Sequence, residues 1–224
     1  LQSLAGFQWV SAIDLNMGYY HIELDLCAQE ICTIVFPWGK FSYNRLPMGI
    51  VCAPDIFQNE MASLMAELEH VRAYLDDLLV ITKGTFEDHL IKLDEVLAKL
   101  MKAGITVNLK KSFLACVETD YLGCKITREG LMPQQNKIKA ILALKPPTTL
   151  KLNRSLLGMV QYYRDIWPKR SHILTPLTDA SSSKNKKKFK RTEEMDKAFI
   201  QMKQIIAQET ILAFPDWSKP FDIY

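Results

Sequence analysis

Two adjacent carboxylates, Asp76 and Asp77, stand between short apolar runs at residues 71–75 and 78–82. This pattern predicts a tight β-hairpin with the two aspartates at its tip. Neighbouring carboxylates repel each other, so the flanking apolar strands must hold them in place. Asp is also common in turns that only face solvent. The pair is therefore a candidate site that needs a further ligand.

A third carboxylate, Asp14, lies near the end of another apolar, β-rich run, Phe7–Leu15. If this run joins the hairpin in one sheet, the three carboxylates can hold two Mg²⁺ ions in oxygen-rich shells. Two ions close together suit an in-line phosphoryl displacement. One lowers the pKa of the attacking hydroxyl and the other stabilises the leaving pyrophosphate. We expect Asp14 and Asp76 on neighbouring strands, near a common ion position.

The elements that must position these residues mix short strands and helices, which predicts an α+β fold. A helix should begin at Pro54, a favoured first helical position, and another at the capping box Thr85 to Asp88. Further strands are predicted at residues 31–36, 41–43 and 121–127. Further helices are predicted at residues 136–144, at residues 152–163 and after Thr192.

Charge is distributed unevenly along the 224 residues, although the net charge is only +3. Residues 1–100 carry a net charge of −8 and residues 101–224 a net charge of +11. An acidic half beside a basic half suits a cation-binding centre next to a polyanion-binding surface. Two solvated faces of different charge would give the same pattern. The candidate phosphate-binding residues of the basic half are Lys184, Lys186, Lys187, Lys188, Lys190 and Arg191.

The five cysteines form no CxxC pair, which predicts buried free thiols and an intracellular protein. The longest apolar stretches are too short to cross a bilayer, so no membrane partner is expected. The N-terminus lacks an initiator Met and the features of a signal peptide. We therefore expect the chain to be a piece of something longer.

Several motifs occur in an order that resembles the palm of reverse transcriptases from long-terminal-repeat retroelements. The residues within these motifs resemble those of the Ty3/gypsy group. These motifs are Ser11–Leu15 with Gly18-Tyr19, Leu46–Gly49 with Ala53-Pro54 and Phe57-Gln58, Tyr74–Asp77, and Tyr121–Gly123. Residues 156–164, 176–178 and 214–221 resemble the downstream region of the same group. The resemblance covers essentially the whole chain.

The resemblance implies a polymerase palm at residues 1–127, an antiparallel sheet packed on helices with the fingers largely missing. It implies a small, basic, helical thumb or connection at 128–188 and a truncated start of the RNase H-like region at 189–224. The implied function is an RNA-directed DNA polymerase segment of a retrotransposon Pol polyprotein. A segment with these limits should be incomplete as a polymerase by itself and should lack RNase H activity.

The resemblance also implies roles for single residues. Asp14 and Asp76 would bind the metal ions, with Asp77 as a close third carboxylate, and Lys111 would protonate pyrophosphate. Tyr19 would be the steric gate against ribonucleotides, and Met48 and Gly49 would contact nucleotide and template. Tyr121, Leu122 and Gly123 would form the primer grip. A strand tyrosine, a plain turn and a solvated lysine pair are the ordinary explanations of Tyr19, Gly49 and Lys111.

The cofactors implied are two Mg²⁺ ions, with Mn²⁺ as an alternative. The implied partners are an RNA or DNA template, a DNA or tRNA primer, deoxynucleotides, and the RNase H, integrase and protease of the polyprotein. The implied location is a cytoplasmic retroelement particle, with nuclear entry left open. One alternative is a decayed or domesticated copy that binds nucleic acid without catalysis. Another two-metal nuclease or phosphatase lacks the additional clustered His or Glu ligands.

The chain departs from the family pattern at Tyr20-His21, Ser112 and Arg191. None of these positions is a carboxylate of the site.

Overall fold

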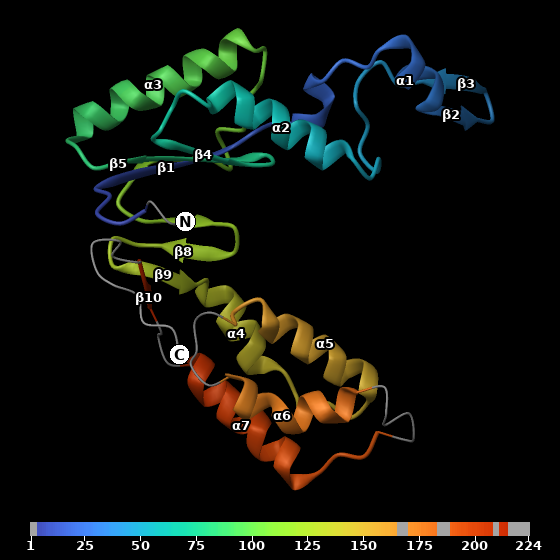
Figure 1. The fold of residues 1–224 in the computed structure, drawn as a ribbon, viewed down its shortest axis with the longest axis vertical. Helices are drawn as coiled ribbons and strands as arrows, with labels where there is room; N and C mark the ends of the chain where they lie inside the picture. Colours follow the sequence, from blue (N-terminus) through green and yellow to red (C-terminus); the bar gives the residue numbers. More distant parts are fainter. Residues whose placement is uncertain (1–3, 165–169, 183–188, 208–210, 215–224) are drawn as a thin grey trace. The chain divides into compact units, whose positions relative to one another are not determined.

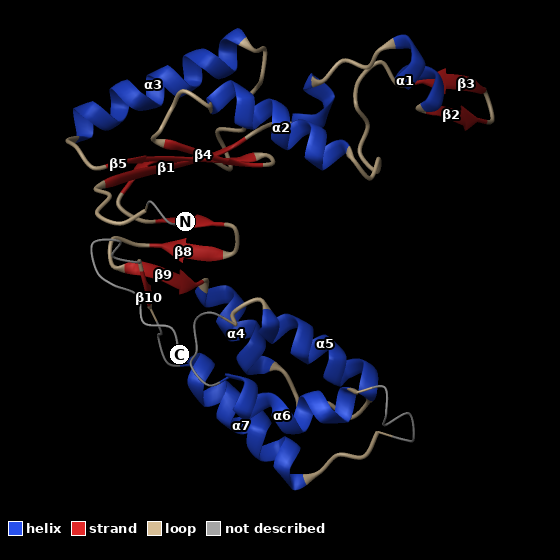
Figure 2. Cartoon of the chain, viewed as in Figure 1, coloured by secondary structure: helices blue, strands red, loops and turns tan. Residues whose placement is uncertain are grey.

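The computed structural model describes residues 4–164, 170–182, 189–207 and 211–214. The chain forms two compact units, one from Ser3–Tyr121 and the other mainly from Leu122–Tyr224. Figure 1 colours the chain from end to end, and Figure 2 shows that both units contain helices and strands. The fold is therefore α+β, as predicted. The assignment of residues 1–127, 128–188 and 189–224 to palm, thumb and RNase H-like regions stays a prediction.

The first unit is built on an antiparallel sheet with the strand order β4-β5-β1-β6. Its strands are β1 (Trp9–Asp14), β4 (Val71–Tyr74), β5 (Asp77–Thr82) and β6 (Phe113–Cys116). Strands β1 and β5 pair in continuous register from Trp9 opposite Thr82 to Asp14 opposite Asp77. The expected strand that ends at Asp14 therefore lies directly beside the hairpin.

Two helices, α2 (Ala53–Met65) and α3 (Phe86–Lys102), lie against this sheet (Figure 1). Both begin where the sequence predicts. Pro54 lies in the first turn of α2, and the Thr85 side chain accepts a hydrogen bond from the Asp88 N–H at the start of α3. Side chains of both helices and of the strands form one core: Ile13, Leu15, Phe57, Met61, Met65, Val71, Leu78, Val80, Leu93, Val96 and Leu100. This core fixes the strands whose ends carry the carboxylates.

The rest of the first unit comprises η1 (Gly18–His21), α1 (Leu26–Ile31), β2 (Thr33–Phe36), β3 (Gly39–Ser42) and β7 (Thr119–Tyr121). The strand expected at 31–36 begins only at Thr33, because Ile31 ends the short helix α1. The Asp25 carboxylate starts this helix by accepting a hydrogen bond from the Ala28 N–H at 2.7 Å. Strand β3 begins at Gly39, two residues before the strand expected at 41–43, and pairs with β2 as an antiparallel hairpin.

A buried histidine ties α3 to the sheet. The two ring nitrogens of His89 lie 2.8 Å from Ser11 Oγ on β1 and 2.8 Å from Thr82 Oγ1 on β5. Ser11 Oγ also accepts a hydrogen bond from the Ala115 N–H of β6. All three polar side chains are essentially inaccessible to solvent. Burial, the largest cause, lowers the pKa of His89, because a charged imidazole would lose its hydration.

Replacing His89 by Gln should remove a pH-dependent part of the stability of this unit. An unfolded histidine titrates near 6.5, and the folded pKa is lower, so the unfolded state binds more protons below that pH. The stability from neutral His89 is therefore present above about pH 6.5 and lost as the pH falls through the folded pKa. Chemical unfolding of both proteins between pH 5 and 7.5 measures this. A stability difference that stays constant over this range would contradict the prediction.

The second unit contains four helices and a small antiparallel sheet among its described residues. They are β8 (Cys124–Ile126), β9 (Gly130–Pro133), α4 (Gln135–Ala143), α5 (Leu150–Gln161), α6 (Arg170–Ser181), α7 (Glu193–Ala207) and β10 (Leu212–Ala213). The helices share one core: Ile138, Ile141, Leu156, Val160, Tyr163, Leu174, Leu177, Met195, Ala198, Phe199, Met202 and Ile206. Helices α4, α5 and α7 agree with the predicted ones, whereas α6 contains Pro176 and was not predicted.

The single strand predicted over Tyr121–Thr127 is wrong. Leu122 and Gly123 have φ values of 47° and 73°, in the left-handed region, so the backbone turns between β7 and β8. Gly123 tolerates this conformation without cost, whereas nothing in the sequence indicates it for a leucine.

The five cysteines are unpaired, as predicted, but none is buried, so the expectation of buried thiols is wrong. In the part of the chain that the structure describes, every helix is too short or too polar to span a bilayer.

Candidate active site

The tip of the β4–β5 hairpin is a two-residue turn formed by Leu75 and Asp76. Tyr74 pairs with Asp77, so Asp77 is already the first residue of β5. This shifts the turn by one residue from the predicted Asp76-Asp77 tip. Leu75 has a φ of 51°, which a branched residue adopts only where other contacts impose it.

The contact that imposes this turn comes from Gln58 on α2. Gln58 Oε1 accepts a hydrogen bond from the Leu75 N–H at 2.7 Å, and Gln58 Nε2 donates one to the Ala73 carbonyl at 3.2 Å. One amide side chain therefore binds the backbone on both sides of Tyr74. The sequence indicated no role for Gln58 beyond its place in the Phe57-Gln58 motif of the resemblance.

Asp14 is held at the end of β1 by the segment that follows α3. The Asp14 N–H donates to Ser112 Oγ at 3.1 Å, and the Asn108 N–H donates to the Asp14 carbonyl at 2.8 Å. Across the sheet, Asp14 lies directly opposite Asp77. Directly opposed residues of antiparallel strands project to the same face, so these two carboxylates share one face. Ser112, one of the positions at which the chain departs from the family pattern, therefore binds the backbone of Asp14.

Asp76 is adjacent to both, but its side chain has a different environment. Its carbonyl accepts a hydrogen bond from the Leu15 N–H at 2.8 Å, which joins the turn to the residue after Asp14. Its Oδ1 lies against Gly18. Oδ1 is buried and has no hydrogen-bond partner among the described residues. A buried carboxylate oxygen without a partner is costly unless a cation or a donor arrives.

The three carboxylates influence one another electrostatically. Burial is the largest cause of a raised pKa at Asp76, followed by the charges of Asp77 and Asp14. Burial and the charge of Asp14 likewise raise the pKa of Asp77. Lys111 opposes both shifts, and its Nζ lies 3.8 Å from Asp14 Oδ1. The structure therefore brings together Asp14, Asp76, Asp77 and Lys111, and the roles of these residues stay predictions.

These residues fit divalent cations, because carboxylate oxygens are hard ligands and one of them is buried without a partner. Burial first, and then the neighbouring negative charges, raise the pKa of Asp76 and of Asp77, and a bound cation would offset both effects. The side chains are not yet arranged as a complete set of ligands around one ion. Among the described residues, no three His, Cys, Asp or Glu side chains already surround one ion position. The expected ion position common to Asp14 and Asp76 stays a prediction.

Tyr19 lies beside this group, packed edge-on against Phe57 with ring centroids 5.4 Å apart and planes at 79°. Burial and, after it, the charge of Asp76 raise the pKa of Tyr19. Met48 and Gly49 lie in the loop before α2, where Met48 is exposed. Gly49 has a φ of 96°, so its backbone conformation alone accounts for glycine there.

The primer-grip candidates Tyr121, Leu122 and Gly123 surround the turn between β7 and β8. Tyr121 is buried, and its burial and the charge of Asp77 raise its pKa to about 12. The Leu122 carbonyl accepts a hydrogen bond from the Tyr162 hydroxyl at the end of α5. A Cβ at Gly123 would come within 2.6 Å of that hydroxyl, so this glycine also makes room for Tyr162.

The basic candidates are described only in part. Lys184, Lys186, Lys187 and Lys188 lie outside the described residues. Lys190 is exposed. Arg191 forms an ion pair with Asp196 in the first turn of α7, which leaves it less available for phosphate.

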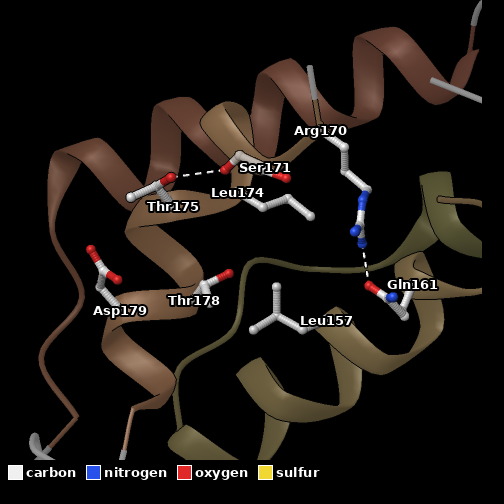
Figure 3. Close-up of a pocket in the computed structure, with 8 residues that line it drawn as sticks. All are labelled: Leu157, Gln161, Arg170, Ser171, Leu174, Thr175, Thr178 and Asp179. Atoms are coloured by element: carbon white, nitrogen blue, oxygen red, sulfur yellow. Dashed lines mark hydrogen bonds between the residues drawn. The ribbon is translucent and has the colours of Figure 1, made fainter. Parts of the chain in front are cut away.

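The second unit has a separate hollow between α5 and α6, with a volume of about 400 Å³ (Figure 3). Arg170 at its edge donates a hydrogen bond to Gln161 Oε1, and Thr175 Oγ1 donates one to the Ser171 carbonyl. Three of the polar side chains that line it, Gln161, Arg170 and Thr175, thus already bond within the protein. It contains none of the carboxylates described above.

Comparison with known proteins agrees with this arrangement. The family model for reverse transcriptase (RNA-dependent DNA polymerase) matches residues 1–126. The Pol polyprotein of the Drosophila melanogaster transposon opus is 31% identical over 239 residues, which cover 100% of this chain and 23% of the relative. That of transposon 297, from the same organism, is 32% identical over 99% of this chain and 21% of the relative. The chain thus spans less than a quarter of these relatives.

Solved structures with the same fold include the foamy viral protease-reverse transcriptase. Its complex with double-stranded DNA, in the dRH form, gives a TM-score of 0.90 and 27% identity over 96% of this chain and 38% of that chain. Its complex with an RNA/DNA hybrid gives a TM-score of 0.87 and 27% identity over 95% of this chain and 29% of that chain.

The antiparallel sheet packed on helices is that of a polymerase palm. The chain belongs to the reverse transcriptase family, and it resembles the corresponding region of Pol polyproteins from gypsy and other transposons.

Proposed function

We propose that this chain carries the polymerase centre of an RNA-directed DNA polymerase, within a retrotransposon Pol polyprotein. The reaction would add deoxynucleotides to the 3′-hydroxyl of a primer on an RNA or DNA template. One observation carries the proposal. The hairpin tip and the end of β1 bring three carboxylates together, and one of their oxygens is buried without a partner.

Asp14, Asp76 and Asp77 are the residues that would hold the metal ions, two Mg²⁺ or alternatively Mn²⁺. Such ions, when bound, supply charge stabilisation for the phosphoryl group and a lower pKa for the attacking hydroxyl. Asp77 and Asp14 share one face of the sheet, and Asp76 approaches from the turn. Gln58 keeps that turn in place, so the position of Asp76 depends on α2.

The remaining residues would orient substrates and move a proton. Tyr19 presents a ring fixed by Phe57, next to Asp76, where it would block a sugar with a 2′-hydroxyl. Lys111, beside Asp14, would donate a proton from Nζ to the leaving pyrophosphate. Met48 and Gly49 would contact nucleotide and template, and the turn at Tyr121–Gly123 would hold the primer end.

Nucleic acid would bind chiefly through charge. The excess of Lys and Arg in residues 101–224 would contact phosphates without reading sequence. The foamy viral relatives were solved with an RNA/DNA hybrid and with double-stranded DNA, which supports a primer–template duplex as the ligand. Other proposed partners are a DNA or tRNA primer and the RNase H, integrase and protease of the polyprotein. The unpaired cysteines support an intracellular location, in a cytoplasmic retroelement particle.

Primer extension on an RNA template with Mg²⁺ tests this function, using the polyprotein-derived enzyme that contains the chain. We expect incorporation of deoxynucleotides, loss of activity on chelation, and recovery with Mg²⁺ or Mn²⁺. An enzyme that binds primer–template tightly but incorporates nothing under any of these conditions would refute catalysis. The domesticated nucleic-acid binder would then replace the proposal.

A further inference from the structure

Gly18 is buried in η1, near Asp76 of the hairpin tip and Phe57 of α2. Its φ is not positive, so the backbone conformation does not require glycine at this position. The first unit contains glycines that do have this requirement, such as Gly49 and Gly104. The reason for glycine at position 18 must therefore be space.

A side chain at position 18 would enter the place that Asp76 occupies. A Cβ built on Gly18 would overlap Asp76 Oδ1 and would come within 2.7 Å of Cζ of the Phe57 ring. The Phe57 ring is buried at the centre of the core and packs against Tyr19, so it cannot move aside easily. Asp76 would have to move instead.

The oxygen concerned is the buried Oδ1 that has no hydrogen-bond partner among the described residues. Since no donor in the described part of the chain holds it there, packing and the backbone of the turn define its position. Because Gly18 has no side chain, the space that this carboxylate oxygen occupies stays open.

We propose that Gly18 is a positioning residue for Asp76 and so sets the affinity of the site for divalent cations. The inference rests on the proposed function in one respect, because it takes Asp76 as a cation ligand. Gly18 acts through the position of Asp76 and touches neither the cation nor the substrate.

Mn²⁺ binding to the full chain, measured from the electron paramagnetic resonance of unbound Mn²⁺, tests this without any measurement of activity. Gly18→Ala should raise the dissociation constant about 10–100-fold, the range found when residues that orient metal ligands are changed. Asp76→Ala should weaken binding comparably. The double variant should bind as Asp76→Ala does, because the Cβ then has no carboxylate to displace. Gly158→Ala is the matched control, since a Cβ there meets nothing within 4 Å.

Two results would overturn the inference. Gly18→Ala could keep the parent affinity, or its effect could add in full to that of Asp76→Ala. If Gly18→Ala does not fold because of the clash with Phe57, the variant Gly18→Ala/Phe57→Leu relieves the ring contact and leaves the contact with Asp76. That folded variant should still bind Mn²⁺ weakly, and parental affinity in it would place the whole effect in core packing.

A crystal structure of Gly18→Ala separates this inference from the proposed function. If Asp76→Ala leaves Mn²⁺ affinity unchanged, the assignment of Asp76 as a cation ligand fails. The positioning role then depends on the crystal structure alone. We expect the Asp76 carboxylate to have left its place beside residue 18, and an unmoved carboxylate refutes the inference.

Discussion

Asp76→Asn should abolish deoxynucleotide incorporation on an RNA template and leave affinity for primer–template nearly unchanged. The substitution keeps the shape of the side chain between Gly18 and Phe57 but removes its negative charge. Losing one preorganised group that stabilises transition-state charge typically costs about 10²–10³-fold in rate. Duplex binding depends chiefly on the basic residues, so it should stay the same or rise slightly.

Single-turnover incorporation and filter binding on the same primer–template measure these two quantities. Asp94→Asn is the matched control, because Asp94 is exposed on α3 and the chemical change is identical. The control should keep parental values of both. Incorporation by Asp76→Asn above a tenth of the parental rate would show that this carboxylate is not essential.

Tyr19→Ala should allow ribonucleotide incorporation while deoxynucleotide incorporation stays measurable. The ring packs edge-on against Phe57, with 5.4 Å between the centroids, and we propose that it blocks the space of a 2′-hydroxyl. Removing the ring leaves room for a 2′-hydroxyl. We expect preference for deoxynucleotides over ribonucleotides to fall by roughly 10²-fold, the order that one mismatched group produces in a fitted pocket.

Competition between matched nucleotides, read as a ratio of kcat/KM values, measures the preference. Tyr19→Phe keeps the ring and removes only the hydroxyl, so it should discriminate as the parent does. A loss of discrimination in Tyr19→Phe equal to that in Tyr19→Ala would assign the effect to the hydroxyl, against the steric explanation.

The sequence predicted the site well where the signal is local. Apolar runs on both sides of Asp76-Asp77 predicted the hairpin, and the apolar run ending near Asp14 predicted a strand that the structure places beside it. Pro54 and Thr85 marked helix starts because their chemistry acts within one turn. Such features depend on neighbours in the chain, so they can be read without the fold.

Features that depend on distant contacts could not be predicted. Gln58 bonds to the backbone of residues 15 and 17 positions further along the chain, and Ser11 meets His89 across 78 positions. The left-handed conformations of Leu75 and Leu122 have no local cause, since leucine disfavours them. Because the sequence does not indicate the turn at Leu122, one strand was predicted over residues 121–127 where the structure has a turn before β8.

Helix α2 joins the loop that would touch the nucleotide to the hairpin that carries the carboxylates. Ala53, the first residue of α2, comes four positions after Gly49 of that loop. Gln58, little more than one helical turn further on, binds the hairpin backbone. A single helical turn is rigid, so a shift at Ala53 must displace Gln58 with it. The hydrogen bond from Leu75 to Gln58 then carries the shift to Asp76. If Met48 and Gly49 contact a nucleotide as proposed, the start of α2, from Ala53 to Gln58, would pass a shift of that loop on to Asp76.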